Sequence, residues 1–304
     1  MPDRPRVLLT RRIPSSLLSK LEGAVDVEQP EAVPTPEQLR ERIADQDGLI
    51  CVMTDRVDDA LLQAASRLKV IATIAVGYDN IDVPAAKARG VIVTNTPDVL
   101  TEATAELTWA LILGAARRIV EGDRLIRRNG WKRWALDFML GTELRGKQLG
   151  IIGRGRIGRA VAAKAPAFGM TAVFARQDMS IDELLISSDV ISINTSLRSD
   201  TRHLIDRRTL ARMKRSAILV NTARGAVVDE EALAWALKER LIAAAALDVY
   251  EQEPSVHAEL LTMENVVLSP HLGSATRETR TAMIDLAVSN VVEVLEGRPP
   301  LTPI

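Results

Sequence analysis

The sequence predicts an α/β fold built on parallel sheets and divided into two domains. Short, continuously apolar runs alternate with helical stretches through the first hundred residues, and the same alternation resumes in the second half of the chain. Such strands are typical of a parallel sheet that helices cover on both faces. With 304 residues and 47% hydrophobic content, the chain is long and apolar enough for two cores of this kind.

The first hundred residues contain a regular series of predicted elements. Strands are expected at 6–10, 48–52, 70–76 and 91–94, and helices at 14–21, 58–66 and 84–89. The polar segment 95–98 then interrupts the pattern and is the expected crossover into the second domain. A long helix is expected from 101 to 118, with Thr101 as its cap, and a basic helix follows over 119–128.

A glycine-rich turn stands at the middle of the chain, between an apolar strand and an alanine-rich helix. Gly153 permits the tight turn, Gly155 lets the backbone approach a pyrophosphate, and Gly158 lets helix and strand pack closely. The first helical residues, Arg156 and Ile157, offer backbone N–H groups at the positive end of the helix dipole. This pattern predicts a dinucleotide-binding domain of the Rossmann type, and a tight turn without a ligand is the alternative.

Arg176 is the expected determinant of which dinucleotide binds. It follows the next predicted strand, 171–175, where NAD sites carry an acidic residue that accepts hydrogen bonds from the ribose hydroxyls. A guanidinium at this position holds the 2′-phosphate of NADP and stacks on adenine. The sequence therefore favours NADP. Two alternatives stay open: NAD, with Asp178 at the ribose, and an exposed arginine without a ligand.

Three candidate catalytic residues, Arg224, Glu253 and His271, each follow a different predicted strand. Because open α/β sheets bind ligands at the carboxyl ends of their strands, the three side chains are expected at one site. Arg224 would hold a substrate carboxylate and polarise the neighbouring carbonyl. His271 would protonate the developing alkoxide, with Glu253 keeping the imidazole protonated near neutral pH. This set suits the reduction of a 2-oxo acid, although each residue taken alone is more often a surface or capping group.

A turn in the first domain is a candidate carboxylate-binding site. Segment 75–80 follows a predicted strand, and the backbone N–H groups around Val76 and Gly77 are expected to form a nest for an anion. A plain turn is an equally good interpretation of these residues.

Composition and charge exclude several classes of function. The net charge of −1 gives no global field for nucleic acid or membrane. A single cysteine, Cys51, excludes an intramolecular disulfide framework, and the three histidines lack metal-ligand spacing, so no metal site is expected. The N-terminus lacks the apolar core of a signal peptide and no apolar run reaches membrane-spanning length, so a soluble cytoplasmic protein is expected.

Motifs spread along nearly the whole chain resemble those of the D-isomer-specific 2-hydroxyacid dehydrogenases, within them the glyoxylate/hydroxypyruvate reductase (2-ketogluconate reductase) branch. The motifs occupy 76–82, 96–101, 153–158, 221–225, 253–254 and 269–275. The resemblance implies that Arg224 binds substrate and that Glu253 pairs with His271, the acid/base. Further substrate contacts are expected at Met53, Val76, Gly77 and Trp134. Further cofactor contacts are expected at Thr195, Thr222, Ala223, Asp248 and Gly273.

The resemblance also implies a domain arrangement and an oligomeric state. Residues 1–98 and 283–304 would form a smaller, flavodoxin-like substrate domain, and 99–282 would form the NAD(P)-binding Rossmann domain inserted in it. Members of the family form homodimers that bury the helices and the loop matching Trp131 and Trp134. In the hydroxypyruvate-reducing branch, the tryptophan matching Trp134 reaches the active site of the partner subunit.

The chain departs from the family at three places beside the predicted cofactor. Only 177–181 separate Arg176 from Asp182, where relatives carry a longer stretch. Ser196 stands where relatives commonly carry proline, and Arg154 occupies a position that is often apolar. Because the first departure borders the adenosine site, the way in which a 2′-phosphate is held stays open.

The sequence therefore predicts an NADPH-preferring reductase of small 2-oxo acids, with glyoxylate and hydroxypyruvate first and 2-ketogluconate next. One alternative is an NAD-dependent D-2-hydroxyacid dehydrogenase, such as one acting on D-3-phosphoglycerate, against which Arg176 argues. The other is a non-enzymatic nucleotide-sensing scaffold, because co-repressors also use this fold.

Overall fold

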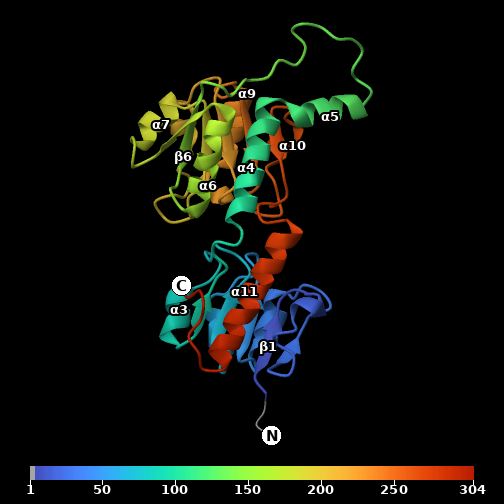
Figure 1. Cartoon of the computed structure of the whole chain (residues 1–304), viewed down its shortest axis with the longest axis vertical. Helices are drawn as coiled ribbons and strands as arrows, with labels where there is room; N and C mark the ends of the chain where they lie inside the picture. The colour runs from blue at the N-terminus through green and yellow to red at the C-terminus, as the bar shows by residue number, and fades with distance from the viewer. Residues whose placement is uncertain (1–3) are drawn as a thin grey trace. The chain divides into compact units, whose positions relative to one another are not determined.

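The structure, a computed structural model, describes residues 4–304, which divide into two compact units. Unit 1 comprises the segment that ends at Leu100 together with Thr276–Ile304, and unit 2 comprises Thr101–Ala275 (Figure 1). The sequence-based boundary at 282/283 falls inside helix α11 (Arg277–Leu295). The whole of α11 belongs to unit 1, because its buried side chains pack on the sheet of that unit.

Unit 1 is a five-stranded parallel sheet with the strand order 2-1-3-4-5, which is the flavodoxin-like order and agrees with the flavodoxin-like domain that the resemblance implies. Its strands are β1 (Arg6–Leu9), β2 (Asp26–Glu28), β3 (Gly48–Cys51), β4 (Val70–Thr73) and β5 (Ile92–Thr94). Its other helices are α1 (Pro36–Ile43), α2 (Asp59–Ala64) and α3 (Val83–Ala88). Strand β2 carries no apolar signal in the sequence because none of its three side chains is buried. The helix expected at 14–21 is only a 3₁₀ turn, Ser15–Leu17, which has no side-chain cap.

Unit 2 is a six-stranded parallel sheet in the order β11-β10-β9-β8-β6-β7. Its strands are β6 (Gln148–Ile152), β7 (Thr171–Phe174), β8 (Val190–Ile193), β9 (Ile218–Asn221), β10 (Ala244–Leu247) and β11 (Val266–Leu268). Its helices are α4 (Thr101–Ala116), α5 (Ile119–Arg127), α6 (Arg156–Lys164), α7 (Ile181–Ser187), α8 (Arg207–Leu210), α9 (Glu230–Lys238) and α10 (Ala258–Thr262). Neighbouring strand residues, such as Val190 and Ile191, enter different buried clusters, so both faces of the sheet are covered.

Strand β7 is an edge strand because the chain returns directly from it into α7. In dinucleotide-binding sheets of order 3-2-1-4-5-6, a further strand flanks this position. Here the Arg176 N–H donates to the Met179 carbonyl at 2.8 Å, closing a short turn. The Asp178 carboxylate accepts from the Phe174 N–H at 2.7 Å and satisfies a backbone donor on the last residue of β7. The shortened segment therefore changes the sheet beside the predicted adenosine site.

Within the part of the chain that the structure describes, no helix combines the length and the apolar character needed to cross a membrane.

Candidate functional site

The carboxyl ends of the strands in unit 2 bring the candidate site residues to one edge of the sheet. Strand β6 leads to Gly153, β7 to Arg176, β9 to Arg224, β10 to Asp248 and β11 to His271. The strand order reverses between β6 and β8, because the chain passes from β7 back across β6. Ligands of open α/β sheets bind at such a switch point.

The glycine loop after β6 has the shape that a pyrophosphate requires. Gly153 has φ 107°, and a Cβ on it would lie 2.5 Å from the Asn194 carbonyl oxygen. A Cβ on Gly158 would overlap the Gly153 carbonyl oxygen, so only glycine lets α6 start here. A Cβ on Gly155 would meet no protein atom within 4 Å, and no side chain caps α6. Space and backbone donors thus coincide where phosphates bind, and these residues fit a nicotinamide dinucleotide.

The loop after β8 borders the glycine loop and offers a further donor. The Asn194 side-chain oxygen accepts from the Ser192 hydroxyl at 2.9 Å, whereas its buried Nδ2 has no partner within residues 4–304. A buried amide donor without a partner is costly unless a ligand satisfies it. Thr195, a predicted cofactor contact, follows directly. Thr222 follows β9, the strand next to β8, and its hydroxyl lies 2.9 Å from that of Thr108.

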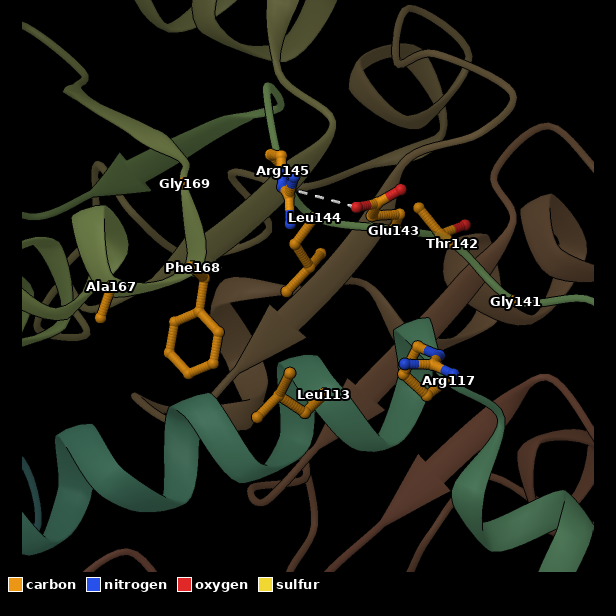
Figure 2. A pocket seen from close by; sticks show the side chains of 10 residues that line it. All are labelled: Leu113, Arg117, Gly141, Thr142, Glu143, Leu144, Arg145, Ala167, Phe168 and Gly169. Atoms are coloured by element: carbon orange, nitrogen blue, oxygen red, sulfur yellow. Dashed lines mark ion pairs between the residues drawn. The ribbon is translucent and has the colours of Figure 1, made fainter.

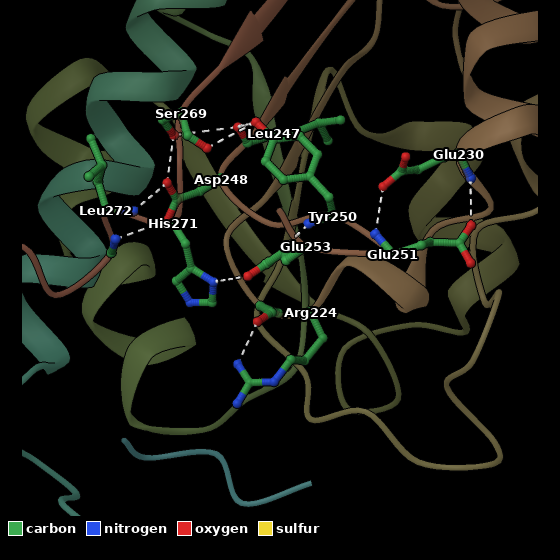
Figure 3. A network of polar contacts seen from close by, with 12 residues as sticks. Arg224, Glu230, Leu247, Asp248, Tyr250, Glu251, Glu253, Ser269, His271 and Leu272 are labelled. Atoms are coloured by element: carbon green, nitrogen blue, oxygen red, sulfur yellow. Dashed lines mark hydrogen bonds and ion pairs between the residues drawn. The ribbon is translucent and has the colours of Figure 1, made fainter. Parts of the chain in front are cut away.

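His271 and Glu253 form a hydrogen-bonded pair, as the sequence predicts. The imidazole Nδ1 lies 2.8 Å from Glu253 Oε2, and Glu253 Oε1 accepts from the Tyr250 N–H at 3.1 Å (Figure 3). Burial disfavours the charged carboxyl group, but the hydrogen bond and charge of His271, the Tyr250 N–H and the Arg224 charge together lower the pKa of Glu253. Glu253 is therefore an ionised partner for Nδ1, and the opposite nitrogen, Nε2, is left for a reactant.

Asp248 organises the loop that carries His271. One carboxylate oxygen accepts from the Ser269 hydroxyl at 2.6 Å and from the Leu272 N–H at 2.7 Å, and the other accepts from the Gly273 N–H at 2.8 Å (Figure 3). The His271 N–H donates to the Asp248 carbonyl at 2.9 Å. Burial raises the pKa of Asp248. From the sequence, Asp248 and Gly273 are expected only as cofactor contacts, and the loop-holding role appears only in the tertiary structure.

Arg224 lies beside this pair, on a loop that packs closely against the Glu253 loop because the next residue is Gly225. A Cβ on Gly225 would overlap the Tyr250 carbonyl group, so the loop carrying Arg224 packs backbone to backbone against the loop carrying Glu253. The guanidinium donates to the Ala223 carbonyl at 2.8 Å. Arg224 is close enough to Glu253 to lower the pKa of its carboxyl group, and Figure 3 draws both side chains next to His271. The three predicted catalytic residues are therefore brought together.

A second carboxylate network, which the sequence did not reveal, fixes the Glu253 loop to α9. The Glu251 N–H donates to Glu230 Oε1 at 2.6 Å, and the Glu230 N–H donates to Glu251 Oε1 at 3.0 Å. His203 Nε2 lies 2.9 Å from the other Glu251 oxygen. Carboxylates are favourable at a helix N-terminus, which accounts for Glu230 and Glu251 at the start of α9. In sequence, both residues look like ordinary surface acids.

Arg176 follows β7, at the predicted adenosine end of the site. It adopts φ 64°, and its Nη1 lies 3.6 Å from Asp200 Oδ2. Asp178, the alternative ribose ligand, is instead engaged with the Phe174 backbone N–H. The guanidinium of Arg154 lies 5.8 Å from the centroid of the Phe174 ring. The residue pattern beside the predicted ribose is therefore more basic than in a site built around an acidic ribose ligand.

The predicted substrate contacts of unit 1 lie at the carboxyl ends of its own strands. Met53 is half-buried in the loop after β3, and Val76 and Gly77 are half-buried in the loop after β4. The Asn95 side-chain amide donates to the Val76 carbonyl at 2.8 Å and holds this second loop. The structure thus places these residues where α/β sheets bind ligands.

Helix α5 and the following loop project from the sheet of unit 2 (Figure 1). Several of their apolar side chains are exposed. Trp134 is 71% exposed and Trp131 is 53% exposed. Within this chain, Trp134 is not brought to His271 or Arg224. The other exposed apolar side chains of this arm, defined here as residues 119–140, are Ile119, Ile126, Leu136, Phe138 and Leu140.

A cavity of about 590 Å³ lies at the opposite edge of the unit 2 sheet, by the amino ends of β6 and β7. Figure 2 shows Leu113 and Arg117 of α4 below it and the Glu143–Arg145 ion pair above it. None of the candidate site residues lines this cavity. No group of three or more metal-ligating side chains occurs among residues 4–304.

The chain is similar in sequence and in fold to known proteins. The family model "D-isomer specific 2-hydroxyacid dehydrogenase, NAD binding domain" matches residues 109–273. A glyoxylate reductase of Aeropyrum pernix is 48% identical, covering 98% of this chain and 95% of the relative. A solved structure from Thermus thermophilus has a TM-score of 0.93 at 45% identity, covering 98% of this chain and 99% of the other. A Sinorhizobium meliloti NADPH-dependent glyoxylate/hydroxypyruvate reductase was solved with NADP and malonate. It has a TM-score of 0.86 at 32% identity, covering 99% of this chain and 97% of the other.

Proposed function

Because this chain belongs to the D-isomer specific 2-hydroxyacid dehydrogenase family, we propose that it reduces glyoxylate and hydroxypyruvate with NADPH as the preferred hydride donor. The family makes it an NAD(P)-dependent oxidoreductase. The observation that carries the substrate class is the His271–Glu253 pair with Arg224 beside it, at the same sheet edge as the glycine loop. A cation for a carboxylate next to an acid/base is the set that a 2-oxo acid requires.

The proposed chemistry assigns each side chain one task. When bound, the reduced nicotinamide supplies a hydride to the carbonyl carbon, C2, of the 2-oxo acid. Arg224 holds the substrate carboxylate and draws electron density from the carbonyl oxygen. His271 donates the Nε2 proton to that oxygen as the alkoxide develops, which completes the 2-hydroxy acid. The ionised Glu253 carboxylate, hydrogen-bonded to His271 Nδ1, holds the ring in place with Nε2 toward the substrate.

The proposal is tested with a panel of 2-oxo acids and both nicotinamide cofactors. We expect turnover of glyoxylate and hydroxypyruvate, slower turnover of 2-ketogluconate, and a kcat/KM for NADPH at least about tenfold above that for NADH, because Arg176 replaces the acidic ribose ligand. A clear NADH preference would overturn the cofactor assignment. NAD-dependent oxidation of D-3-phosphoglycerate as the fastest reaction would favour the alternative dehydrogenase, and absence of all turnover would favour a nucleotide sensor.

The chain is further proposed to form a homodimer through the exposed arm, residues 119–140. Clusters of exposed apolar side chains of this kind mark interaction sites, and the resemblance to homodimeric relatives supports a second copy as the partner. We expect light scattering after size-exclusion chromatography to give twice the monomer mass of 33.2 kDa. The double substitution Leu136→Asp and Leu140→Asp should give monomers, whereas Leu301→Asp, at an exposed leucine of unit 1, should not. A monomeric wild-type protein contradicts this proposal.

Other expectations stay predictions. These are the cytoplasmic location, the substrate contacts of Met53, Val76, Gly77 and Trp134, and the cofactor contacts of Arg156, Ile157, Thr195, Thr222, Ala223, Asp248 and Gly273.

A further inference from the structure

Asp200 is shared by two arginines that come from different loops at the edge of the unit 2 sheet. Arg198 Nε and Nη2 donate to the two Asp200 oxygens at 2.9 and 3.3 Å, and Arg176 Nη1 approaches the same carboxylate at 3.6 Å. All three side chains are about half exposed, so solvent or a ligand reaches them. Two guanidinium groups within reach of one carboxylate are also within reach of another anion in its place.

Both loops are held firmly enough to present these groups. The Arg198 N–H donates to the Thr201 hydroxyl at 2.8 Å, and that buried hydroxyl also donates to the Ser196 carbonyl at 2.8 Å. On the other side, the Arg176 N–H bonds to Met179. Because the backbone on either side is fixed, binding an anion requires mainly the ordering of side chains, which limits the entropic cost of binding.

The glycine loop connects this pair of arginines to the predicted dinucleotide. The loop that carries Arg198 begins at Asn194, whose carbonyl oxygen limits the space around Gly153. Arg176 follows β7, on the other side of β6 in the sheet. The two arginines therefore flank the strand whose end binds the pyrophosphate. The turn after Arg176 contains no second cation, its carboxylate, Asp178, is engaged with the backbone, and its hydroxyl, Ser180, caps α7.

We propose that Arg198 and Arg176 together form the site for the 2′-phosphate of NADP, and that Asp200 is the internal anion which this phosphate replaces. Arg198, on the loop after β8, thus supplies a second cation, which the shortened segment 177–181 does not contain. The inference rests on the proposed NADPH preference and gives it a specific pair of residues. A phosphate dianion balances two guanidinium charges better than a single carboxylate does.

The test measures binding of two nucleotide fragments to the full-length protein by isothermal titration calorimetry. Adenosine 2′,5′-bisphosphate carries the 2′-phosphate, and 5′-AMP lacks it. We expect Arg198→Ala to raise the Kd for the bisphosphate about tenfold and to leave the Kd for 5′-AMP within about twofold. Asp200→Asn should lower the Kd for the bisphosphate several-fold, because the competing charge is gone. Arg212→Ala is the matched control, since Arg212 is an exposed arginine paired with Asp182 in the same unit.

The outcomes separate this inference from the proposed function. If the wild-type protein binds the bisphosphate no better than 5′-AMP, the NADPH preference itself fails, and this inference fails with it. If the wild-type protein prefers the bisphosphate and Arg198→Ala keeps that preference, the NADPH proposal stands and the assignment of Arg198 is overturned. If Asp200→Asn weakens binding of the bisphosphate, Asp200 supports the phosphate instead of being replaced by it, and the proposed role of Asp200 is wrong. Thermal unfolding of each variant confirms that these exposed substitutions leave the fold intact.

Discussion

Replacing His271 with glutamine is expected to lower kcat for glyoxylate reduction by about 10²–10⁴-fold, because a general acid contributes about this factor. Glutamine keeps a polar side chain near Glu253, but it cannot carry the proton that the alkoxide needs. Since the loop that holds His271 is tied by the Asp248 carboxylate and not by the imidazole, the fold should survive. Steady-state kinetics with NADPH, together with thermal unfolding, measure both effects.

Two further variants make this result specific. His257→Gln changes a histidine elsewhere in unit 2 and should keep kcat within about twofold of wild type, because general-acid catalysis depends on a group positioned at the reacting atoms. Glu253→Gln keeps the side-chain shape but removes the negative charge 2.8 Å from the ring. In this variant, kcat for glyoxylate reduction should fall, because the hydrogen bond that positions the imidazole loses its charged acceptor. Wild-type kcat in His271→Gln would show that another group supplies the proton.

Replacing Gly155 with alanine is expected to weaken NADPH binding without unfolding the protein. A Cβ at this position meets no protein atom within 4 Å, and the backbone of Gly155, at φ −68° and ψ −173°, is accessible to alanine. The methyl group instead occupies the space that the pyrophosphate would take. Overpacking of this kind costs about 1–3 kcal/mol, which corresponds to about a five- to 150-fold rise in Kd. Fluorescence titration of bound NADPH measures the change.

Two glycine controls separate binding from folding in this experiment. Gly158→Ala places a Cβ against the Gly153 carbonyl oxygen, so it should lower both the melting temperature and the affinity. Gly114→Ala lies inside α4, where a Cβ meets nothing within 4 Å, so it should keep the Kd and stabilise the protein by about 0.5–1 kcal/mol. Unchanged NADPH binding in Gly155→Ala would contradict the placement of the pyrophosphate at this loop.

Features encoded by neighbouring residues were predictable from the sequence. The continuous apolar runs identified most strands of both sheets, because buried parallel strands carry apolar side chains on both faces. The spacing of Gly153, Gly155 and Gly158 predicted a phosphate-binding loop, and the requirement for glycine at 158 is local, because a Cβ there would overlap the Gly153 carbonyl oxygen. The positions of Arg224 and His271 directly after strands placed them at one edge, since the carboxyl ends of parallel strands lie together.

Features that depend on residues far apart in the chain were decided only by the tertiary structure. Strand β2 was missed because its side chains are not buried, so its position depends on pairing with β1. Asp248 holds the His271 loop through bonds that span more than twenty residues. The meeting of Arg176 and Arg198 at Asp200 follows from the packing of two separate loops. Sequence periodicity and spacing report the local demands of the backbone, whereas such contacts exist only once the sheet has set which loops are neighbours.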